Sequence, residues 1–597
     1  MHKINFDKKM TYWNALWLPF KIAPGCAIIF LLNDMIRLFT APLGVWAMSR
    51  FIDEMFSVFQ YGGKMYSVLF ALLLMVVLRL YQYIANPILG LVKKRYEQKN
   101  WMAIDHPLIP TYAGLELKNT EDAEKQDLIT RVWSEAPHIA LPYIWSDFEE
   151  FIVQLGIIIS YIVILLSNAP LAGAVILIAA VPAIILARKL GKERYKKKKS
   201  LTQNNRELQE MQYYFRERQY ASERKLFDYT EKMNEKYIEL TNTVRKAEVK
   251  LFRKNLFLKN LSSILLICLG SSAFFLFLPY VKNGTMSVGA YISLIGVLFS
   301  TISNVTWNFP SYFENFAINS AYLKDFNEYL MLGKEKGALD EMAETVEPFQ
   351  KLEFRNVSFK YPGTEKEILK NISFVIESGK SYAIVGINGS GKTTIVKLIL
   401  RLYSDYEGEI LLNGKPLAEY PMAQIKAMFS AVFQDYAQYD VSLSDNINIG
   451  AGLHATYEEI DRAISESGLD DVVKNMKHGK DTLLGKIYDD GIELSQGQWQ
   501  RVAIARALIS PAQLKIMDEP TASLDPIAEQ EVYAHFNKIK KNTTTIFITH
   551  RLASVKDIDT ILVLNDGKID AKGNHNELLE KNGLYAEMFA SQQGWYI

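Results

Sequence analysis

Cysteine is scarce in this sequence. The 597 residues include only Cys26 and Cys268, and each lies inside an apolar run. This low count excludes a disulfide framework, and the spacing excludes a cysteine-based metal site. Both thiols are therefore expected to pack as small buried hydrophobic groups.

An excess of charge of one sign is also absent. Lysine and arginine together number 67 and aspartate and glutamate 66, so the net charge is +1 at pH 7. This balance gives no electrostatic reason to expect a nucleic-acid partner. The apolar fraction of 49% and the aromatic fraction of 12% argue against a disordered chain, and the length requires at least two domains.

Long apolar runs are confined to the part of the chain before about residue 320. Six of them approach the roughly 20 residues that a helix needs to cross a bilayer, at 23–47, 66–92, 150–167, 170–188, 257–281 and 286–309. Residues 1–335 are therefore predicted to form a transmembrane domain with six membrane-spanning helices. A linker over 336–349 and a second domain over 350–597 are predicted to follow.

The distribution of positive charge predicts the orientation of these helices. The connection over 93–149 opens with Lys93, Lys94 and Arg95, and the connection over 189–256 contains the lysine run 196–199. Because positive connections stay in the cytoplasm, both connections and both termini are predicted to lie there, in a multi-pass protein of the cell membrane. Their composition favours helices that extend the spans. A nucleic-acid patch is the alternative for the lysine run.

Polar residues inside apolar runs are candidates for a role in transport. Asp34 and Arg37 lie three residues apart in the first run, a spacing that predicts an ion pair along one helix face. Contact with a substrate is the alternative role for this pair. Asn304, Trp307 and Asn308 are candidates for lining a cavity, although ordinary helix packing explains them equally well.

From about residue 350 the pattern changes to short β-rich runs separated by helical ones, which predicts an α/β domain. The strand-like run "SYAIVG" leads into "GINGSGKTT", which matches G-x-x-x-x-G-K-[ST]. Backbone N–H groups of such a loop, and the helix that follows it, bind phosphate oxygens. The predicted ATP-binding residues are Gly386, Ile387, Asn388, Gly389, Ser390, Gly391, Lys392, Thr393 and Thr394.

Hydrolysis of a bound nucleotide needs a metal ligand and a base. Asp518 ends an apolar run and is predicted to hold Mg²⁺ together with Thr393 and Gln434. Glu519 follows directly, where a carboxylate can polarise the attacking water. Gln434 and His550 each follow an apolar strand-like run, so they are predicted to reach the same ligand crevice. The predicted catalytic residues are Glu519, His550 and Gln434.

A second anion cradle is predicted at "LSQGQ", residues 494–498, directly before a helical pattern. Together with the phosphate loop and Asp518-Glu519, this stretch resembles the signature L-S-G-G-Q of the ATP-binding cassette (ABC) transporter family. The resemblance implies that Ser495, Gln496, Gly497 and Gln498 bind the ATP held by a second cassette. It also implies that Tyr361 stacks on adenine and that Asp525 crosses the dimer interface.

The resemblance extends over nearly the whole chain and implies a half-size exporter, in which six membrane helices precede an α/β P-loop nucleotide-binding domain. Its partner would be a second copy of the chain or a paired half-transporter. Coupling helices that dock on the cassettes are expected near 115–125 and 221–230.

The sequence departs from the family pattern at two positions. Gln496 replaces a glycine of the signature but leaves the serine and the following glycine intact, so little change is expected there. More informative for the substrate is Lys486, which follows Gly485 where drug exporters of the family usually carry a glutamate. The run "DDGIELSQGQWQ" resembles bacterial lantibiotic and other peptide exporters, which favours a modified peptide as substrate. A lipid or hydrophobic drug, a regulatory ATPase that transports nothing, and import instead of export are the alternatives. A soluble ATPase acting on DNA or ribosomes is excluded by the spans.

Overall fold

The computed structural model describes residues 9–135, 141–168, 200–304, 308–520 and 543–593, with isolated residues between 169 and 200. The chain forms two compact units. The first contains residues up to 112 and 123–332, and the second contains 113–122 and 333–597. The short segment 113–122 thus belongs to the second unit although the sequence on both sides of it belongs to the first.

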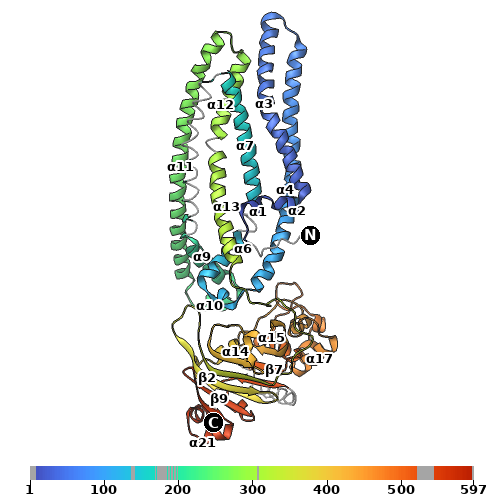
Figure 1. Cartoon of the computed structure of the whole chain (residues 1–597), viewed down its shortest axis with the longest axis vertical. Helices are drawn as coiled ribbons and strands as arrows, with labels where there is room; N and C mark the ends of the chain where they lie inside the picture. Colours follow the sequence, from blue (N-terminus) through green and yellow to red (C-terminus); the bar gives the residue numbers. More distant parts are fainter. Residues whose placement is uncertain are drawn as a thin grey trace. The chain divides into compact units, whose positions relative to one another are not determined.

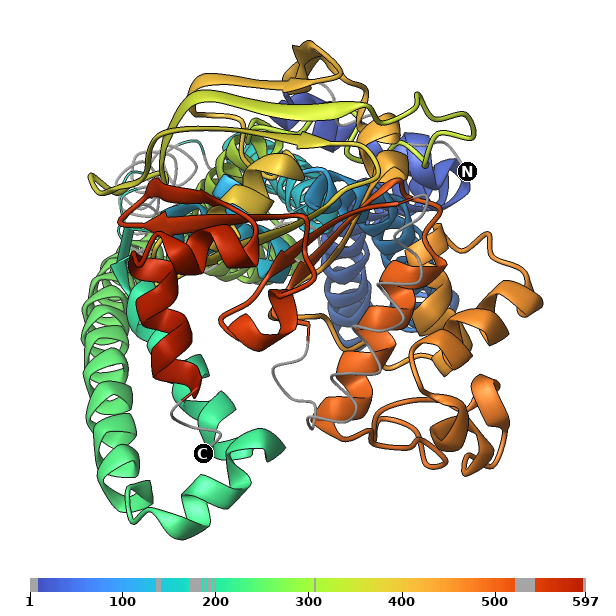
Figure 2. The ribbon, with the colours of Figure 1, turned by 90° about the horizontal axis from the view of Figure 1, so that it is seen from below.

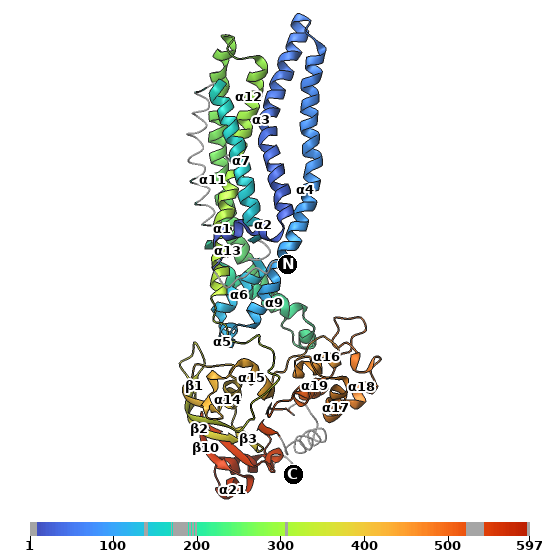
Figure 3. The same cartoon turned by 45° about the vertical axis from the view of Figure 1, so that its right-hand side comes forward.

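The described part of the first unit is helical. Its helices are α1 (Tyr12–Leu16), α2 (Leu18–Ile22), α3 (Pro24–Tyr61), α4 (Met65–Ala113), α6 (Ala123–Glu135), α7 (Leu141–Asn168), α9 (Thr202–Arg216), α10 (Ala221–Leu226), α11 (Thr230–Lys282), α12 (Val288–Ser303) and α13 (Phe309–Leu330). The long helices run side by side (Figure 1 and Figure 3). Helix α3 packs against both α7 and α12.

Three described helices are long and apolar enough to cross a membrane, over Pro24–Tyr61, Met65–Ala113 and Tyr143–Asn168. A shorter apolar helix covers Val288–Thr301, within the predicted sixth span. The predicted fifth span lies inside α11, whereas almost all of the predicted fourth span, 170–188, lies outside the described residues. The count of six spanning helices therefore stays a prediction.

Helices α4 and α11 extend well beyond a bilayer. They contain 49 and 53 residues, which corresponds to about 75–80 Å at 1.5 Å per residue. Each continues from an apolar stretch into one of the two charged connections. The prediction that these connections lengthen the membrane helices is confirmed for both.

Many exposed side chains of α3 and α4 are apolar. Phe39, Leu73 and Leu91 are 69%, 61% and 74% exposed, as suits side chains that face lipid. Cys26 is buried as expected, but the expectation is wrong for Cys268, which is exposed. Its position in α11 follows Leu261 and Ile264 at helical spacing, and both of these are also exposed. Cys268 therefore lies on an apolar outer face of that helix.

The second unit contains two β-sheets. One has the strand order β2 (Glu367–Glu377), β1 (Lys351–Lys360), β4 (Glu407–Leu412) and β5 (Lys415–Pro416), with all neighbours antiparallel. The other has the order β10 (Lys568–Gly573), β9 (Thr560–Asn565), β3 (Ser381–Gly386), β8 (Thr544–Ile548), β7 (Leu514–Asp518) and β6 (Phe429–Val432). Strands β9 to β6 in this order are parallel.

Helices cover the larger sheet on both faces, which explains why every residue of β3, β7 and β8 is buried. The helices of this unit are α5 (Leu117–Glu121), α14 (Lys392–Ile399), α15 (Met422–Met428), α16 (Leu443–Asn448), α17 (Tyr457–Glu466), α18 (Asp470–Lys474), α19 (Gln496–Ile509), α21 (His575–Glu580) and α22 (Leu584–Gln593). One core joins α14 to both sheets, and another joins α19, α21 and α22 to the opposite face of the larger sheet.

The helices α16 to α18 form a separate lobe of the second unit. They share a hydrophobic cluster with α19 that includes Leu443, Ile460 and Trp499. In Figure 2 this lobe is orange and lies apart from the yellow strands of the four-stranded sheet. The parallel strands, the phosphate loop and this lobe together form the α/β domain that the sequence predicts from residue 350.

Candidate functional site

The phosphate loop joins β3 to α14. Gly391 is the N-cap of α14 and has φ of 105°, a left-handed conformation that favours glycine. A Cβ at this position would lie 2.6 Å from a side-chain carbon of Leu369. The loop can therefore keep this course only with glycine at 391, and the N-terminus of α14 is left accessible from the cavity beside it.

Lys392 lies at the start of α14 and is almost fully buried. Its Nζ donates hydrogen bonds to the carbonyl oxygens of Gly386 and Ile387, at 3.0 and 3.1 Å. Burial lowers the pKa of Lys392, and the nearby carboxylates of Glu519 and Asp518 oppose that effect. The ammonium group is thus held inside the loop, beside two acids.

Asp518 ends β7 and is 1% exposed. Both of its carboxylate oxygens are buried and have no hydrogen-bond partner among the described residues. Burial raises the pKa of Asp518 to about 6, while interaction with the Thr393 hydroxyl favours the charged form. A buried carboxylate next to a hydroxyl offers the oxygen ligands that Mg²⁺ prefers. The predicted metal residues therefore fit this ion.

Glu519 is at the centre of the predicted catalytic group. Its Oε2 accepts a hydrogen bond from Nε2 of Gln434 at 3.2 Å, and its Oε1 lies 3.3 Å from Nδ1 of His550. Its own backbone N–H donates to the Ile548 carbonyl at 2.9 Å. The structure thus brings together three predicted side chains from the ends of three neighbouring parallel strands.

The backbone of Glu519 is in the left-handed region, with φ of 50°. This conformation is uncommon for a residue with a side chain and is costly unless the surroundings impose it. Here Gln500 of α19 also donates to the Glu519 carbonyl, at 3.3 Å. The carboxylate is therefore aimed away from the strand by its backbone as well as by its side-chain partners.

A cavity of about 550 Å³ lies against the phosphate loop. Its lining includes most of the predicted nucleotide site: Tyr361, Asn388, Gly389, Gly391, Lys392, Thr393, Thr394, Gln434, Glu519 and His550. A cavity of this size and polarity can hold a nucleoside triphosphate.

Tyr361 lies at one end of that cavity. Its hydroxyl is 3.0 Å from Oγ1 of Thr394, and its ring packs edge-on against Phe359 and Tyr403. The Nζ of Lys397 lies 5.2 Å from the centre of the ring. The described position of Tyr361 thus brings it to the phosphate loop, and its stacking on adenine stays a prediction.

The signature stretch caps a helix. Ser495 is the N-cap of α19, where its hydroxyl accepts from the Gln498 backbone N–H and its own N–H donates to the Gln498 side chain. None of residues 494–498 lines the cavity at the phosphate loop. Binding of these residues to the ATP of a second cassette stays a prediction. Asp525, which the resemblance places at the dimer interface, lies outside the described residues.

Helix α5 lies within the predicted coupling segment 115–125 and belongs to the second unit. Lys118 pairs with Asp405 at 2.8 Å. Glu121 accepts a hydrogen bond from the Tyr403 hydroxyl and pairs with Lys397 at 3.2 Å. Because Lys397 lies on α14, these contacts connect α5 to the helix that begins at the phosphate loop. The other predicted coupling segment, near 221–230, contains α10.

In the first unit, Arg37 interacts more closely with Glu150 of α7 than with Asp34, its predicted partner within α3. The guanidinium donates two hydrogen bonds of 2.7 Å to the carboxylate of Glu150 on α7, whereas Asp34 lies 3.6 Å away. A bidentate geometry makes the contact with Glu150 the stronger one. Glu150 is thus a functional candidate that the sequence analysis did not single out.

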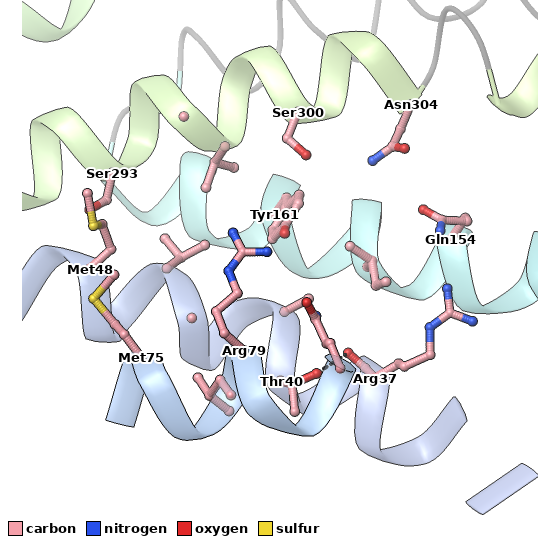
Figure 4. A pocket seen from close by; sticks show the side chains of 18 of the residues that line it. Arg37, Thr40, Met48, Met75, Arg79, Gln154, Tyr161, Ser293, Ser300 and Asn304 are labelled. Atoms are coloured by element: carbon pink, nitrogen blue, oxygen red, sulfur yellow. Dashed lines mark hydrogen bonds between the residues drawn. The ribbon is translucent and has the colours of Figure 1, made fainter. Parts of the chain in front are cut away.

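Two cavities of the first unit meet at Arg37. One, of about 610 Å³, is lined by residues of α3, α4, α7 and α12, about half of them apolar, and its polar lining residues include Arg37, Arg79, Gln82, Gln154, Ser300 and Asn304. Figure 4 shows the polar ends of Arg79, Ser300 and Asn304 directed into the cavity. The other, of about 680 Å³, contains Asp34 and Arg37 in its lining.

The predicted cavity residues have different outcomes. Asp34, Arg37 and Asn304 line a cavity, whereas Asn308 does not appear in either lining and instead donates to Asn304 at 2.6 Å. Trp307 lies outside the described residues. Arg79 and Gln154 were missed, although a charge inside an apolar run and an amide four residues after Glu150 are both visible in the sequence.

Comparison with known proteins identifies relatives. A profile described as "ABC transporter" matches residues 369–522. The subtilin transport ATP-binding protein SpaT of Bacillus subtilis is 31% identical over 494 residues, which cover 82% of this chain and 79% of that protein. An ATP-dependent lipid A-core flippase of Pseudomonas aeruginosa is 40% identical over 259 residues, or 42% of each protein. The structure of a bacterial Atm1-family ABC exporter with ATP bound has the same fold, with a TM-score of 0.81 at 24% identity over 96% of this chain and 99% of that one.

Proposed function

The chain belongs to the ABC transporter family, as a half-size exporter that couples ATP hydrolysis to transport, and from this premise we propose that it exports a modified peptide as a homodimer. Both termini and both cassettes lie in the cytoplasm in this proposal. The positive connections around Lys93 and the lysine run 196–199 support that orientation.

The polar cavity of about 610 Å³ carries the proposal of a peptide substrate. Charged and amide groups cost free energy inside a membrane domain, so their presence there indicates a functional site. A peptide backbone needs hydrogen-bond donors and acceptors along its length, and Gln82, Gln154 and Asn304 provide both. A path for lipid would instead be lined mainly by apolar groups.

The pattern of similarity also favours a peptide. The match with the subtilin transport protein covers 82% of this chain, so it extends beyond the second unit into the residues before 333. The match with the lipid A-core flippase covers 42%, no more than the length of the nucleotide-binding half. Lipid transport is the second candidate, since that match is the more identical of the two at 40%.

Each side chain of the nucleotide site has a role in the proposed reaction. Lys392 and the backbone N–H groups of the phosphate loop bind the β- and γ-phosphates. Mg²⁺, when bound, would neutralise phosphate charge, and Thr393, Gln434 and Asp518 are the residues that would hold it. Glu519 accepts the proton of the attacking water, while His550 orients the carboxylate.

The position of Ser495 supports the dimer. The cap of α19 offers backbone N–H groups and a hydroxyl, but it contributes nothing to the cavity at its own phosphate loop. In the proposed homodimer it faces the γ-phosphate held by the partner chain, so two ATP molecules lie between two cassettes. Closing on ATP and reopening after hydrolysis favours different states of the membrane domain, which is the condition for directed transport.

Transport into sealed vesicles tests the substrate class. The purified chain is reconstituted with its cassettes outside, and ATP-dependent uptake is measured for leader-bearing and leaderless modified peptides, phospholipids and cationic dyes. Lys392→Ala vesicles control for passive leakage. We expect uptake and ATPase stimulation with peptide. Stimulation by lipids or dyes with no response to any peptide contradicts the peptide proposal and leaves the ATPase function in place.

A further inference from the structure

The cavity of about 680 Å³ in the first unit, here called the acidic cavity, has an unbalanced charge. Its lining comes from α3, α4, α7 and α13 and contains two cationic residues, Arg37 and Lys93. Five carboxylates share that lining: Asp34, Glu97, Asp147, Glu149 and Glu150. The neighbouring cavity of about 610 Å³ is the opposite, with Arg37 and Arg79 and no acid in its described lining.

Three of the five carboxylates already have partners. Glu150 is held by the two hydrogen bonds from Arg37. Glu97 pairs with Lys94 at 2.7 Å. Asp147 accepts hydrogen bonds from the side chains of Asn315 and Asn319, at 3.0 and 2.8 Å. The remaining two, Asp34 and Glu149, interact through a hydrogen bond between their carboxyl groups, which keeps one proton on the pair and leaves it with one negative charge.

Asp34 is 5% exposed, yet its Oδ2 is buried and accepts no hydrogen bond from any N–H group among the described residues. Its Oδ1 has only distant contacts, with Asn33 at 3.5 Å and Arg37 at 3.6 Å. The proton shared by Asp34 and Glu149 leaves one negative charge buried between them. Buried acids in this arrangement are unfavourable unless a cation balances them.

The rest of the lining suits an organic cation. Phe30, Tyr96, Tyr143, Trp145 and Tyr312 all contribute to the same cavity, and aromatic faces attract ammonium and guanidinium groups. The cavity already holds one such contact, since Nζ of Lys93 lies 5.2 Å from the centre of the Tyr143 ring. The hydroxyl of Tyr96 is buried without a hydrogen-bond partner among the described residues, so it too can accept a donor.

A metal ion fits the cavity less well than an organic cation. Among the described residues no group of three or more His, Cys, Asp or Glu side chains has a geometry that could hold a metal. The volume is also far larger than a single ion needs, and aromatic rings are not metal ligands.

We propose that the acidic cavity binds a cationic group of the transported substrate, a lysine ammonium, an arginine guanidinium or the N-terminal ammonium of the peptide. This proposal rests on the proposed function, because it assigns a subsite for the same cargo. The negative charge shared by Asp34 and Glu149 provides the counter-charge, and the aromatic residues enclose the cation. Arg37, which lines both cavities, marks where the acidic cavity ends and the polar one begins.

A pair of synthetic peptides of one sequence tests this subsite. One peptide carries free lysine side chains and N-terminus, and the other carries the same residues fully acetylated. Stimulation of ATPase activity and vesicle uptake are measured against concentration for both. We expect the free peptide to half-saturate the wild-type protein at a concentration at least about tenfold lower than the acetylated peptide does, since a desolvated charge pair of this kind contributes an affinity of that order.

The variants Asp34→Asn and Glu149→Gln localise the effect. Asp34→Asn is expected to raise the half-saturating concentration of the free peptide about tenfold or more and to leave that of the acetylated peptide unchanged. Glu149→Gln keeps the charge of Asp34 and a donor to it, so its effect on the free peptide is expected to be smaller. Glu54→Gln is the matched control, because Glu54 is also on α3, pairs only weakly with Arg50 at 3.7 Å and lines neither cavity. It should behave as wild type with both peptides.

Each result decides a different claim. Equal half-saturation of wild type by the two peptides overturns the subsite without requiring any variant to fold, and leaves peptide export intact. An equal loss with both peptides in Asp34→Asn and Glu149→Gln also overturns it. If no peptide is transported but a cationic dye is, with dependence on Asp34, the subsite stands and the peptide function fails.

Discussion

Replacing Glu519 by glutamine isolates its chemistry from its shape. The carboxylate lies 3.2 Å from the Gln434 amide and 3.3 Å from the His550 ring, and its side chain is only 15% exposed. An amide fills the same space but cannot accept a proton from water. Loss of a positioned base lowers a rate about 10²- to 10⁴-fold, or about 3–5 kcal/mol in the activation free energy.

ATP binding should survive this substitution, because Lys392 and the phosphate loop are unchanged. The assay is phosphate release by reconstituted protein, alongside retention of labelled ATP. We expect turnover to stop while an ATP-bound dimer accumulates. Glu458→Gln, an exposed acid in the first turn of α17, is the control and should hydrolyse as wild type does. Hydrolysis by Glu519→Gln within severalfold of wild type would remove Glu519 from the role of base.

The pairing of His550 with Glu519 allows a stricter test of the same reasoning. If His550 acts by orienting the carboxylate, then His550→Ala should slow wild type but add little to Glu519→Gln, because residues that act as a unit are not additive. Independent, multiplicative losses would show that His550 contacts the nucleotide by itself.

The remaining predictions concern the same half of the chain. Lys392→Ala should weaken ATP binding and turnover together, measured by nucleotide titration and phosphate release, because the cation contacts phosphate throughout the reaction. A mixed dimer with Lys392→Ala in one chain and Ser495→Arg in the other should keep one intact site; if it fails to trap ATP while each singly mutated mixed dimer succeeds, binding in trans is wrong. Lys515→Met should lower the thermal unfolding midpoint, since the buried Nζ donates to the carbonyls of Ala507, Leu508 and Ser510 at the end of α19, and each lost bond costs about 1–3 kcal/mol. Burial lowers the pKa of Lys515 to about 8. Between pH 8 and about 10.5, the unfolded chain therefore binds a proton at Lys515 that the folded chain does not, and the contribution of Lys515 to stability rises with pH across that window. Melting curves of Lys515→Met should lack that rise.

The nucleotide site could be predicted from the sequence because its motifs are local. The phosphate loop needs glycine at fixed spacings, and Asp518 and Glu519 are adjacent, so their chemistry is readable without knowing the fold. Parallel strands then bring their carboxyl ends to one edge, which is why Gln434 and His550 meet Glu519 although they are far apart in the chain.

The membership of the segment 113–122 in the second unit was harder to predict from the sequence. Its position depends on contacts of α5 with Tyr403 and Asp405, more than 280 residues away. The resemblance to a family indicated the segment, but nothing in its own residues predicts which side chains it meets. Charged side chains such as Lys118 and Glu121 find partners on α14 and in the segment that follows it, which only folding brings close.

The partner of Arg37 shows most directly why local spacing fails within the membrane domain. A separation of three residues places Asp34 and Arg37 on one face of α3, but a guanidinium that folds back along its own helix presents only one edge to the acid. Glu150 approaches from α7, a different helix, and can receive both N–H groups at 2.7 Å. Because the bidentate contact is stronger, Arg37 turns toward Glu150 and leaves Oδ2 of Asp34 without an N–H donor among the described residues. The unbalanced charge in the acidic cavity therefore arises from competition between a near acid in sequence and a better oriented one in space.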